Sequence, residues 1–508
     1  MVSANNQTRR NFIFNILSLC LNVVIGLLYT PYLVKELGVI AYGVVPLALV
    51  LNQYIGVVTG SLTSAMTRFY SIALQKNDDK EASEYISTAL VIIVAFFIIL
   101  YPILYFFVQK IDVFFKIPIF LLQDAQVLFN LTILSFFLSL LSSIFNITLY
   151  AYNRLDLMNL IKIMRLVSKF IFVIILFSSI NANIKYIGYA NLGSEIFVLV
   201  TSLVLFFQMA KNRVHLSLKN FNSVTLISVL GLTTWTIIHQ LGDTGIYRID
   251  IFLTNIFWST KESGILGALS EIGVYITTSI MVISSLFGPL ILIAYSKGDH
   301  QTVKIMTLDR SLIVGVITAI IVGVVIGFSK QIIEFWLGPS FVDYSLWLVL
   351  KLLLIPFYAA AGVFVFVYRA WNQVKIPALI TVMIGLLNIV LSLLIIKIGK
   401  GNYNSILGML IVGSVSGITQ SYILNGWCIN RIYPELKSAI IKNFLIILII
   451  LVMVSIFSFC VNYLFPYTNV LYFLIVISIS FVISFIASFK LALNKEQQKS
   501  IIELFYIK

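Results

Sequence analysis

Several ionisable side chains lie inside stretches that are otherwise apolar, and these are the residues best suited to do chemistry. His239, Asp243 and Asp250 occur at positions i, i+4 and i+11, which places them near one face of a helix. Arg248 lies in the same stretch. A guanidinium forms paired, charge-assisted hydrogen bonds with phosphate, whereas carboxylates and an imidazole can balance that charge or carry protons. The pattern therefore predicts an anion site with coupled titratable groups.

Four further ionisable residues lie in other apolar stretches. Each costs at least ~2.5–3.5 kcal/mol on insertion scales when it is placed centrally in a membrane, so each should face protein or water. We expect the cations to line a hydrated cavity that holds an anionic headgroup, and the acids and the histidine to balance charge or carry a coupling ion. The predicted substrate-binding residues are Arg68, Arg248 and Lys351, and the predicted coupling or charge-balance residues are Glu195, Asp243, Asp250, Glu271 and His239.

Structural interpretations of the same residues stay open. Arg248 and Glu271 have comparable depth in consecutive apolar stretches, so they could form a purely structural ion pair. Lys351 could extend to the outer surface, because a lysine near a helix end keeps its ammonium in water. Arg68 could act only as an anchor at the inner boundary of the membrane.

The elements that carry these residues are predicted to be transmembrane helices. Of the 508 residues, 60% are hydrophobic and only 11% are charged, and apolar segments near the roughly 20 residues of a helical crossing recur along the chain. Segments such as 89–100 are continuously apolar, which excludes the alternating pattern of a transmembrane β-barrel. We therefore predict an all-α, polytopic bundle of about fourteen transmembrane helices. The predicted spans are 12–34, 40–61, 85–108, 126–151, 159–180, 184–208, 225–257, 264–294, 311–329, 344–368, 376–397, 403–428, 440–462 and 468–489.

The distribution of Lys and Arg predicts the orientation. With an inner amino terminus and alternating spans, 24 of the 34 basic residues fall on the inner side, 8 fall on the outer side, and Arg248 and Lys351 lie within spans. Lys162, Arg165 and Lys169 are counted on the inner side. This bias follows the positive-inside rule and predicts that both termini are cytoplasmic. The net charge of +14 then reflects topology and contact with anionic membrane lipids, not nucleic-acid binding.

A weak internal repeat organises the chain. Segment 36–40 resembles 262–266, segment 151–153 resembles 370–372, and Gly188, Gly193 and Ser194 correspond to Gly408, Gly413 and Ser414. The repeat predicts two parallel six-helix lobes with the substrate site between them. The predicted domains are residues 1–212, a six-helix lobe; 213–432, a second six-helix lobe; and 433–508, two further helices and a cytoplasmic tail.

Motifs for catalysis are absent from the sequence. It contains no GxxxxGK[ST], HExxH or GxSxG motif and no cluster of Cys and His at the spacing of metal ligands. The three cysteines lie in or at the end of apolar spans, as buried thiols do. We therefore predict a protein that is not an enzyme, with no cofactor and no metal site.

Several short motifs carry a family resemblance. The opening Arg10-Asn11, Tyr29-Thr30-Pro31-Tyr32-Leu33, Leu37-Gly38 and Tyr42-Gly43 resembles the first two helices of bacterial polysaccharide flippases of the Wzx type. Ser61, Ser64 and Arg68 resemble the end of the second helix, and Asp250 with Glu262-Ser263-Gly264-Ile265-Leu266-Gly267 is similar to the junction of helices 7 and 8. The motifs are shared across a superfamily that also contains multidrug exporters and the lipid II flippase.

The resemblance implies transport of undecaprenyl-diphosphate-linked oligosaccharide units across the bacterial inner membrane by alternating access. The product would serve O-antigen, capsule or teichoic-type polymers. Implied partners are the lipid-linked substrate, membrane lipids, H⁺ or Na⁺ as a coupling ion, and polymerase or assembly proteins. The alternatives are an ion-coupled multidrug exporter or a lipid II flippase of the same architecture, and a membrane synthase. The synthase is disfavoured because such enzymes usually carry a large extracytoplasmic loop.

Overall fold

A computed structural model describes most of the chain. The described residues are 4–50, 66–67, 69–71, 73–74, 76–210, 213–217, 220–285, 287–399, 401–466, 469–494 and 497–498. Within them the regular elements are helices, and no strand occurs. The main helices are α1 (Ala4–Tyr42), α3 (Asp79–Gln109), α5 (Leu122–Ala151), α6 (Leu155–Ser179), α7 (Ile184–Ala210), α8 (Ser223–Tyr247), α9 (Ile249–Phe257), α10 (Thr260–Ser285), α11 (Phe287–Ser296), α12 (His300–Gly327), α13 (Ser329–Leu337), α14 (Ser345–Leu352), α15 (Ile355–Ala370), α16 (Lys375–Ile398), α17 (Asn404–Ile418), α18 (Asn425–Ile432), α19 (Lys437–Leu464) and α20 (Val470–Ala492).

The all-helical, polytopic membrane architecture predicted from the sequence is confirmed. Among the described residues, 11 helices are long and apolar enough to cross a membrane, and each coincides with a predicted span. Three predicted spans have no counterpart among these 11 helices. Span 40–61 lies partly outside the described residues, and spans 159–180 and 225–257 correspond to α6 and to α8 with α9, whose polar and charged side chains lower their hydropathy. The predicted number of fourteen is therefore approximate.

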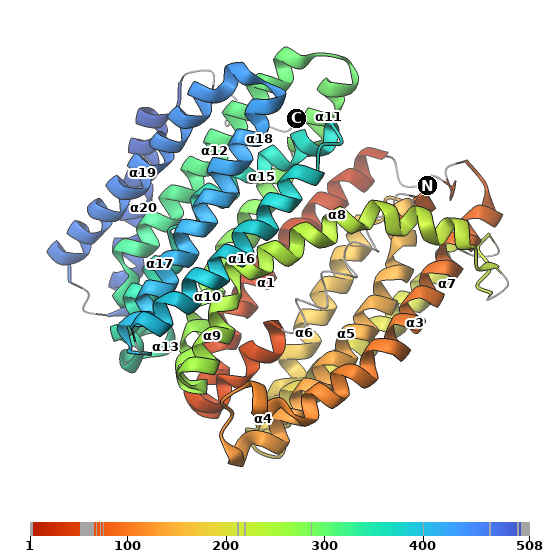
Figure 1. Cartoon of the computed structure of the whole chain (residues 1–508), viewed down its shortest axis with the longest axis horizontal. Coiled ribbons are helices and arrows are strands. Elements are labelled where there is room, and N and C mark those ends of the chain that lie inside the picture. The colour runs from red at the N-terminus through yellow and green to blue at the C-terminus, as the bar shows by residue number, and fades with distance from the viewer. Residues whose placement is uncertain are drawn as a thin grey trace. The chain divides into compact units, whose positions relative to one another are not determined.

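The contacts of the chain group it into two compact units. Unit 1 consists of residues 1–244 and 251–267, and unit 2 consists of residues 245–250 and 268–508. In unit 1, α7 packs on α5 and α6, α6 also packs on α1, and α3 packs on α5 (Figure 1). In unit 2, α12 packs on α15, α19 and α20, and α16 packs on α17 (Figure 1). The lobes with boundaries at residues 212 and 432 stay a prediction.

Helix boundaries repeat along the chain at a nearly constant offset. Helices α6 and α16 begin at Leu155 and Lys375, and α7 and α17 begin at Ile184 and Asn404, an offset of 220 in both cases. Asn153 and Asn372, from the matched segments 151–153 and 370–372, have φ angles of 55° and 53°. Asparagine tolerates this left-handed conformation better than most residues. The sequence match therefore marks two turns with the same backbone.

A second pair of equivalent turns precedes α3 and α12. Lys76-Asn77-Asp78 and Lys297-Gly298-Asp299 have a left-handed second residue, with φ 58° at Asn77 and 73° at Gly298. The aspartate that follows caps the next helix in each case. Asp78 Oδ1 accepts a hydrogen bond of 2.8 Å from the Glu81 N–H, and Asp299 Oδ1 accepts one of 3.0 Å from the Thr302 N–H. The sequence analysis did not predict this second pair of equivalent turns.

The match of segment 36–40 with 262–266 does not correspond to equivalent backbone. Gly38 breaks α1 with a φ of 75°, whereas Gly264 lies inside α10. The two segments instead pack on each other within unit 1. A Cβ on Gly264 would lie 2.7 Å from the Cα of Gly43, and a Cβ on Gly267 would lie 2.5 Å from the Cγ of Pro46. These glycines serve close helix packing.

The cap of α12 has a pH dependence of known sign. Hydrogen bonds from the Thr302 side chain and main chain hold the pKa of the Asp299 carboxyl below its ordinary value of 3.8. A carboxyl whose pKa is lowered by folding stabilises the fold above its ordinary pKa, and this contribution is lost as the pH falls. We expect Asp299→Ala to lower the Tm of the purified protein at pH 7, and we expect the difference from wild type to shrink below pH 3.8.

The matched control for this measurement is Asp343→Ala, because Asp343 is an exposed carboxyl in the same unit. Thermal unfolding in detergent is followed by tryptophan fluorescence. An equal loss for the two variants at pH 7 would contradict the capping role of Asp299.

Candidate functional site

A row of basic residues lies along one face of α6 in unit 1. Lys162, Arg165 and Lys169 are spaced i, i+3 and i+7, so they project from neighbouring turns of the same face. The Nε of Arg165 lies 2.8 Å from Oε1 of Glu195 on α7. The Nζ of Lys169 lies 5.1 Å from the ring centroid of Tyr29 on α1, a cation–π contact. The row therefore places three cations on one helix face, and Arg165 of this row lies beside a carboxylate.

The pair of Arg165 and Glu195 is close but incompletely hydrogen-bonded. The side chain of Glu195 is only 12% exposed. The Nε–H of Arg165 is not aligned with Oε1 although the atoms are 2.8 Å apart, and Oε2 of Glu195 is buried with no hydrogen-bond partner among the described residues. A carboxylate with one unsatisfied oxygen retains an acceptor for a proton or another donor.

Arg165 lies well inside α6. The sequence analysis counted Lys162, Arg165 and Lys169 on the inner side of the membrane, and that assignment stays a prediction; in the structure all three lie within α6. Arg165 is ten residues from the start of that helix, which corresponds to about 15 Å along its axis. Glu195, which was predicted to lie mid-span, lies beside it.

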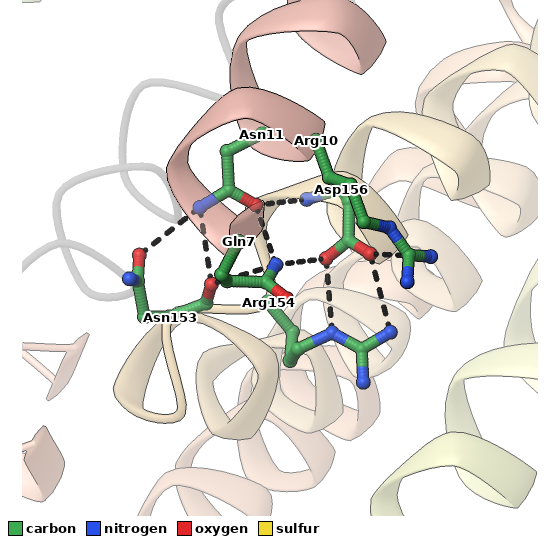
Figure 2. Close-up of polar contacts among 6 residues, drawn as sticks. All are labelled: Gln7, Arg10, Asn11, Asn153, Arg154 and Asp156. Atoms are coloured by element: carbon green, nitrogen blue, oxygen red, sulfur yellow. Dashed lines mark hydrogen bonds and ion pairs between the residues drawn. The ribbon is translucent and has the colours of Figure 1, made fainter. Parts of the chain in front are cut away.

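A second cluster joins the beginning of α1 to the turn between α5 and α6 (Figure 2). Asp156 is 1% exposed, and its carboxylate accepts hydrogen bonds from Arg154 Nε at 3.0 Å, Arg154 Nη2 at 3.2 Å and Gln7 Nε2 at 2.9 Å. Arg10 Nη2 forms an ion pair with it at 3.2 Å. Figure 2 shows the carboxylate surrounded by these groups, so its buried charge is compensated.

The same cluster holds the turn itself. Asn11 Oδ1 accepts a hydrogen bond of 2.9 Å from the Asp156 N–H, and Asn11 Nδ2 donates to the carbonyl oxygen of Asn153 at 3.1 Å (Figure 2). Arg10 and Asn11 belong to the sequence motif that carries the family resemblance. Their contacts give that motif a structural role, which is to attach the amino-terminal end of α1 to the left-handed turn at Asn153.

The predicted residues of unit 2 gather where α8 ends and α9 begins. The Nζ of Lys351 on α14 donates to Oδ2 of Asp250 at 2.6 Å and to the carbonyl oxygen of Tyr247 at 3.2 Å. Asn388 on α16 donates from Nδ2 to the carbonyl oxygen of Gly245 at 3.0 Å. Lys351 thus binds protein oxygens and does not extend to the outer surface.

The other predicted residues are placed as follows. Arg248 is half-buried at the turn between α8 and α9, one residue from the carbonyl oxygen that Lys351 binds. His239 Nδ1 and Asp243 Oδ2 are 3.3 Å apart on α8, as their i, i+4 spacing predicts. Glu271 is half-buried in α10. Arg68 lies outside the described residues.

Cofactor and metal sites find no support in the described part of the chain. No group of three or more His, Cys, Asp or Glu side chains there is arranged to hold a metal ion.

Sequence reasoning missed Asp156 and the α6 row. Asp156 is two residues from Arg154 in a predicted loop. Acidic and basic residues are often neighbours in loops, so their proximity in the sequence did not indicate a buried cluster. The α6 row had a usable signal, since three basic residues at i, i+3 and i+7 inside a predicted span share one helix face.

Comparisons with known proteins agree on the architecture. No protein-family model matches the chain. Over 443 residues it is 25% identical to EpsK of Bacillus subtilis (strain 168), described as an uncharacterized membrane protein, with 85% of each chain covered. It is similar in structure to the lipid II flippase MurJ in an inward closed conformation, with a TM-score of 0.68, 18% identity, and coverage of 94% of this chain and 97% of MurJ.

A multidrug resistance transporter of the MATE family, in an inward-facing conformation, has a TM-score of 0.67 at 13% identity and covers 84% of this chain and 96% of its own. The chain therefore is a membrane protein that has the fold of these solved flippase and transporter structures. These structural relatives are transporters and flippases rather than enzymes. The predicted all-α, polytopic architecture is confirmed by this likeness.

The Asp156 cluster generates a stability prediction. Asp156→Asn keeps the shape of the side chain but removes the charge that Arg10 and Arg154 bind. We expect the free energy of unfolding to fall by about 1–3 kcal/mol, since both arginines are partly exposed and solvent screens the remainder. The measurement is thermal or denaturant unfolding of the purified protein in detergent.

Asp112→Asn is the matched control, because Asp112 is an exposed aspartate of unit 1. The assigned role of Asp156 is rejected if the two variants unfold alike.

Proposed function

We propose that the protein is a flippase for undecaprenyl-diphosphate-linked oligosaccharide units in the synthesis of a bacterial surface polysaccharide. The observation that carries this proposal is the row of Lys162, Arg165 and Lys169 inside α6, opposed by the single carboxylate of Glu195. Three basic side chains on one face of an apolar helix are costly to place in a membrane, and a diphosphate is a ligand that stabilises such an excess of positive charge.

The proposed transport path is cationic. Arg248 and Arg68 are the further groups that we propose contact the diphosphate, and Arg suits this task because its planar fork forms paired hydrogen bonds. We propose that Lys351 neutralises Asp250 and does not bind the substrate, in contrast to the expectation from the sequence. Glu195, Asp243, Glu271 and His239 balance charge or carry the coupling ion.

The remaining parts of the proposal follow the superfamily fold. The protein works by alternating access in the cytoplasmic membrane, with both termini in the cytoplasm, and hands its substrate to polymerase or assembly proteins. Lipid-linked chemistry is supported by the likeness to a lipid II flippase, whereas the comparable likeness to a multidrug transporter supports the exporter alternative. The two differ in the charge they require, because a cationic drug is repelled by the α6 row.

The α6 row generates the first functional prediction. Lys162→Gln with Lys169→Gln removes two cations and leaves the pair of Arg165 and Glu195 intact. In a strain that lacks the chromosomal gene, we expect this double variant to export surface polymer at least about tenfold more slowly than wild type, the effect of losing about 1.4 kcal/mol of interaction with the substrate. Accumulated lipid-linked intermediates and surface polymer are measured together.

Lys397→Gln is the control, since Lys397 is exposed near the end of α16. Normal polymer in the double variant, at equal amounts of protein in the membrane, would exclude the row from the transport path. Lost resistance to cationic dyes with normal polymer would instead favour the exporter.

The second functional prediction concerns the geometry of Arg248. We expect Arg248→Ala to impair polymer export while the protein stays in the membrane, and Arg248→Lys to be only partly active, because lysine lacks the paired donors of a guanidinium. Full activity of Arg248→Lys would indicate that charge alone matters. Unchanged export by Arg248→Ala would remove Arg248 from the site.

A further inference from the structure

The break between α8 and α9 exposes main-chain oxygens to side-chain donors inside unit 2. Helix α8 ends at Tyr247 and α9 begins at Ile249. The carbonyl oxygens near a helix end lose partners from within the helix and need others. The carbonyl oxygen of Gly245 binds Asn388 Nδ2 at 3.0 Å, and that of Tyr247 binds Lys351 Nζ at 3.2 Å.

A carboxylate completes this arrangement. Asp250 is 8% exposed, and its Oδ2 lies 2.6 Å from Lys351 Nζ. The ammonium thus lies between a carboxylate oxygen and a main-chain carbonyl oxygen at a broken helix. In transporters, oxygens at interrupted transmembrane helices coordinate Na⁺ from solution. In this protein they bind a cation that belongs to the chain.

A buried amide oxygen beside the same turn is a further potential ligand for a cation. Asn388 is 1% exposed, and its Oδ1 has no hydrogen-bond partner among the described residues. Its Nδ2 is held by the carbonyl oxygens of Gly245 and Ile246, the latter at 3.5 Å. This unsatisfied amide oxygen belongs to a side chain held at the same helix break, and it is an acceptor of the kind that a small hard cation binds.

We propose that the Lys351 ammonium is a tethered counter-cation in a cation site at the α8–α9 break, and that removing it uncovers a binding site for a small monovalent cation. A tethered group has a high effective concentration at its partner, so Na⁺ from solution does not displace it. In the native protein this centre therefore binds no exchangeable Na⁺. Asp250 is neutralised in a fixed way, which distinguishes it from a carboxylate that loads and releases a coupling ion.

The test measures stability and needs no transport substrate. Full-length protein in detergent is unfolded thermally in NaCl and in choline chloride at equal ionic strength, because choline is too large for the site. We expect the same Tm in both salts for wild type. Lys351→Ala should have a lower Tm in choline chloride and a saturable rise of Tm with NaCl, since a ligand that binds only the folded state stabilises it.

Two further variants complete the design. Asp250→Asn combined with Lys351→Ala removes both charges, so its Tm in choline chloride should exceed that of Lys351→Ala and should not respond to NaCl. Lys351→Arg keeps a tethered cation and should behave like wild type. Lys397→Ala, at an exposed position of the same unit, is the control for loss of a lysine.

Each outcome decides the proposal. A saturable Na⁺-dependent rise of Tm in wild type that the double variant Asp250→Asn with Lys351→Ala loses would show that this centre is open to solution and would overturn the proposal, whereas a rise that the double variant keeps belongs to another site. A folded Lys351→Ala protein that does not respond to Na⁺ would also overturn it. Should Lys351→Ala fail to fold, Na⁺ binding by wild type and Lys351→Arg, measured with radioactive Na⁺, decides the question, because the proposal requires that neither binds the ion at this centre.

Discussion

A charge that enters a membrane-spanning helix must be compensated by the protein, because lipid supplies neither hydrogen bonds nor counter-ions. The described ion pairs follow from this constraint. Asp250 is compensated by Lys351, and Glu195 is compensated by Arg165. Asp156, at a helix end, has Arg154, Arg10 and Gln7 around it. These contacts join different helices, α9 with α14, α6 with α7 and α1 with α6, so they compensate charge and hold the helices together at the same time.

The repeat is symmetrical in its backbone and asymmetrical in its charge. Helices α6 and α16 begin at equivalent positions, 220 residues apart. At that offset, Lys162, Arg165 and Lys169 correspond to Val382, Gly385 and Ile389, and Glu195 corresponds to Val415. The second helix therefore has no basic row. Gly385 instead approaches Gly245, where a Cβ on Gly245 would lie 3.5 Å from its Cα. The face of α6 that carries basic residues therefore corresponds to a face of α16 that packs closely against another helix.

Most of the fold was predictable from the sequence, because the bilayer imposes a length and a composition on every crossing. The eleven apolar helices coincide with predicted spans for this reason. Two further predicted spans, at α6 and at α8 with α9, are not among these eleven helices, and they carry polar and charged side chains.

The candidate site residues were also identifiable from the sequence, since a charged residue in an apolar segment is conspicuous. Their partners were not, because Lys351 meets Asp250, and Arg165 meets Glu195, only after the helices that carry them have packed. The turns were partly predictable. The sequence analysis matched Asn153 with Asn372 as part of a repeated motif, but it did not predict their left-handed backbone conformation.

The ion pair between α6 and α7 has a consequence for how the chain enters the membrane during synthesis. Four charged residues lie in the first fifteen residues of α6, and that helix is not apolar enough to count among the eleven. On its own it would partition poorly into lipid. Helix α7 carries Glu195 and emerges only after α6, separated from it by four residues. The two helices are therefore expected to leave the translocon as a hairpin, with the carboxylate of the later helix completing the insertion of the earlier one.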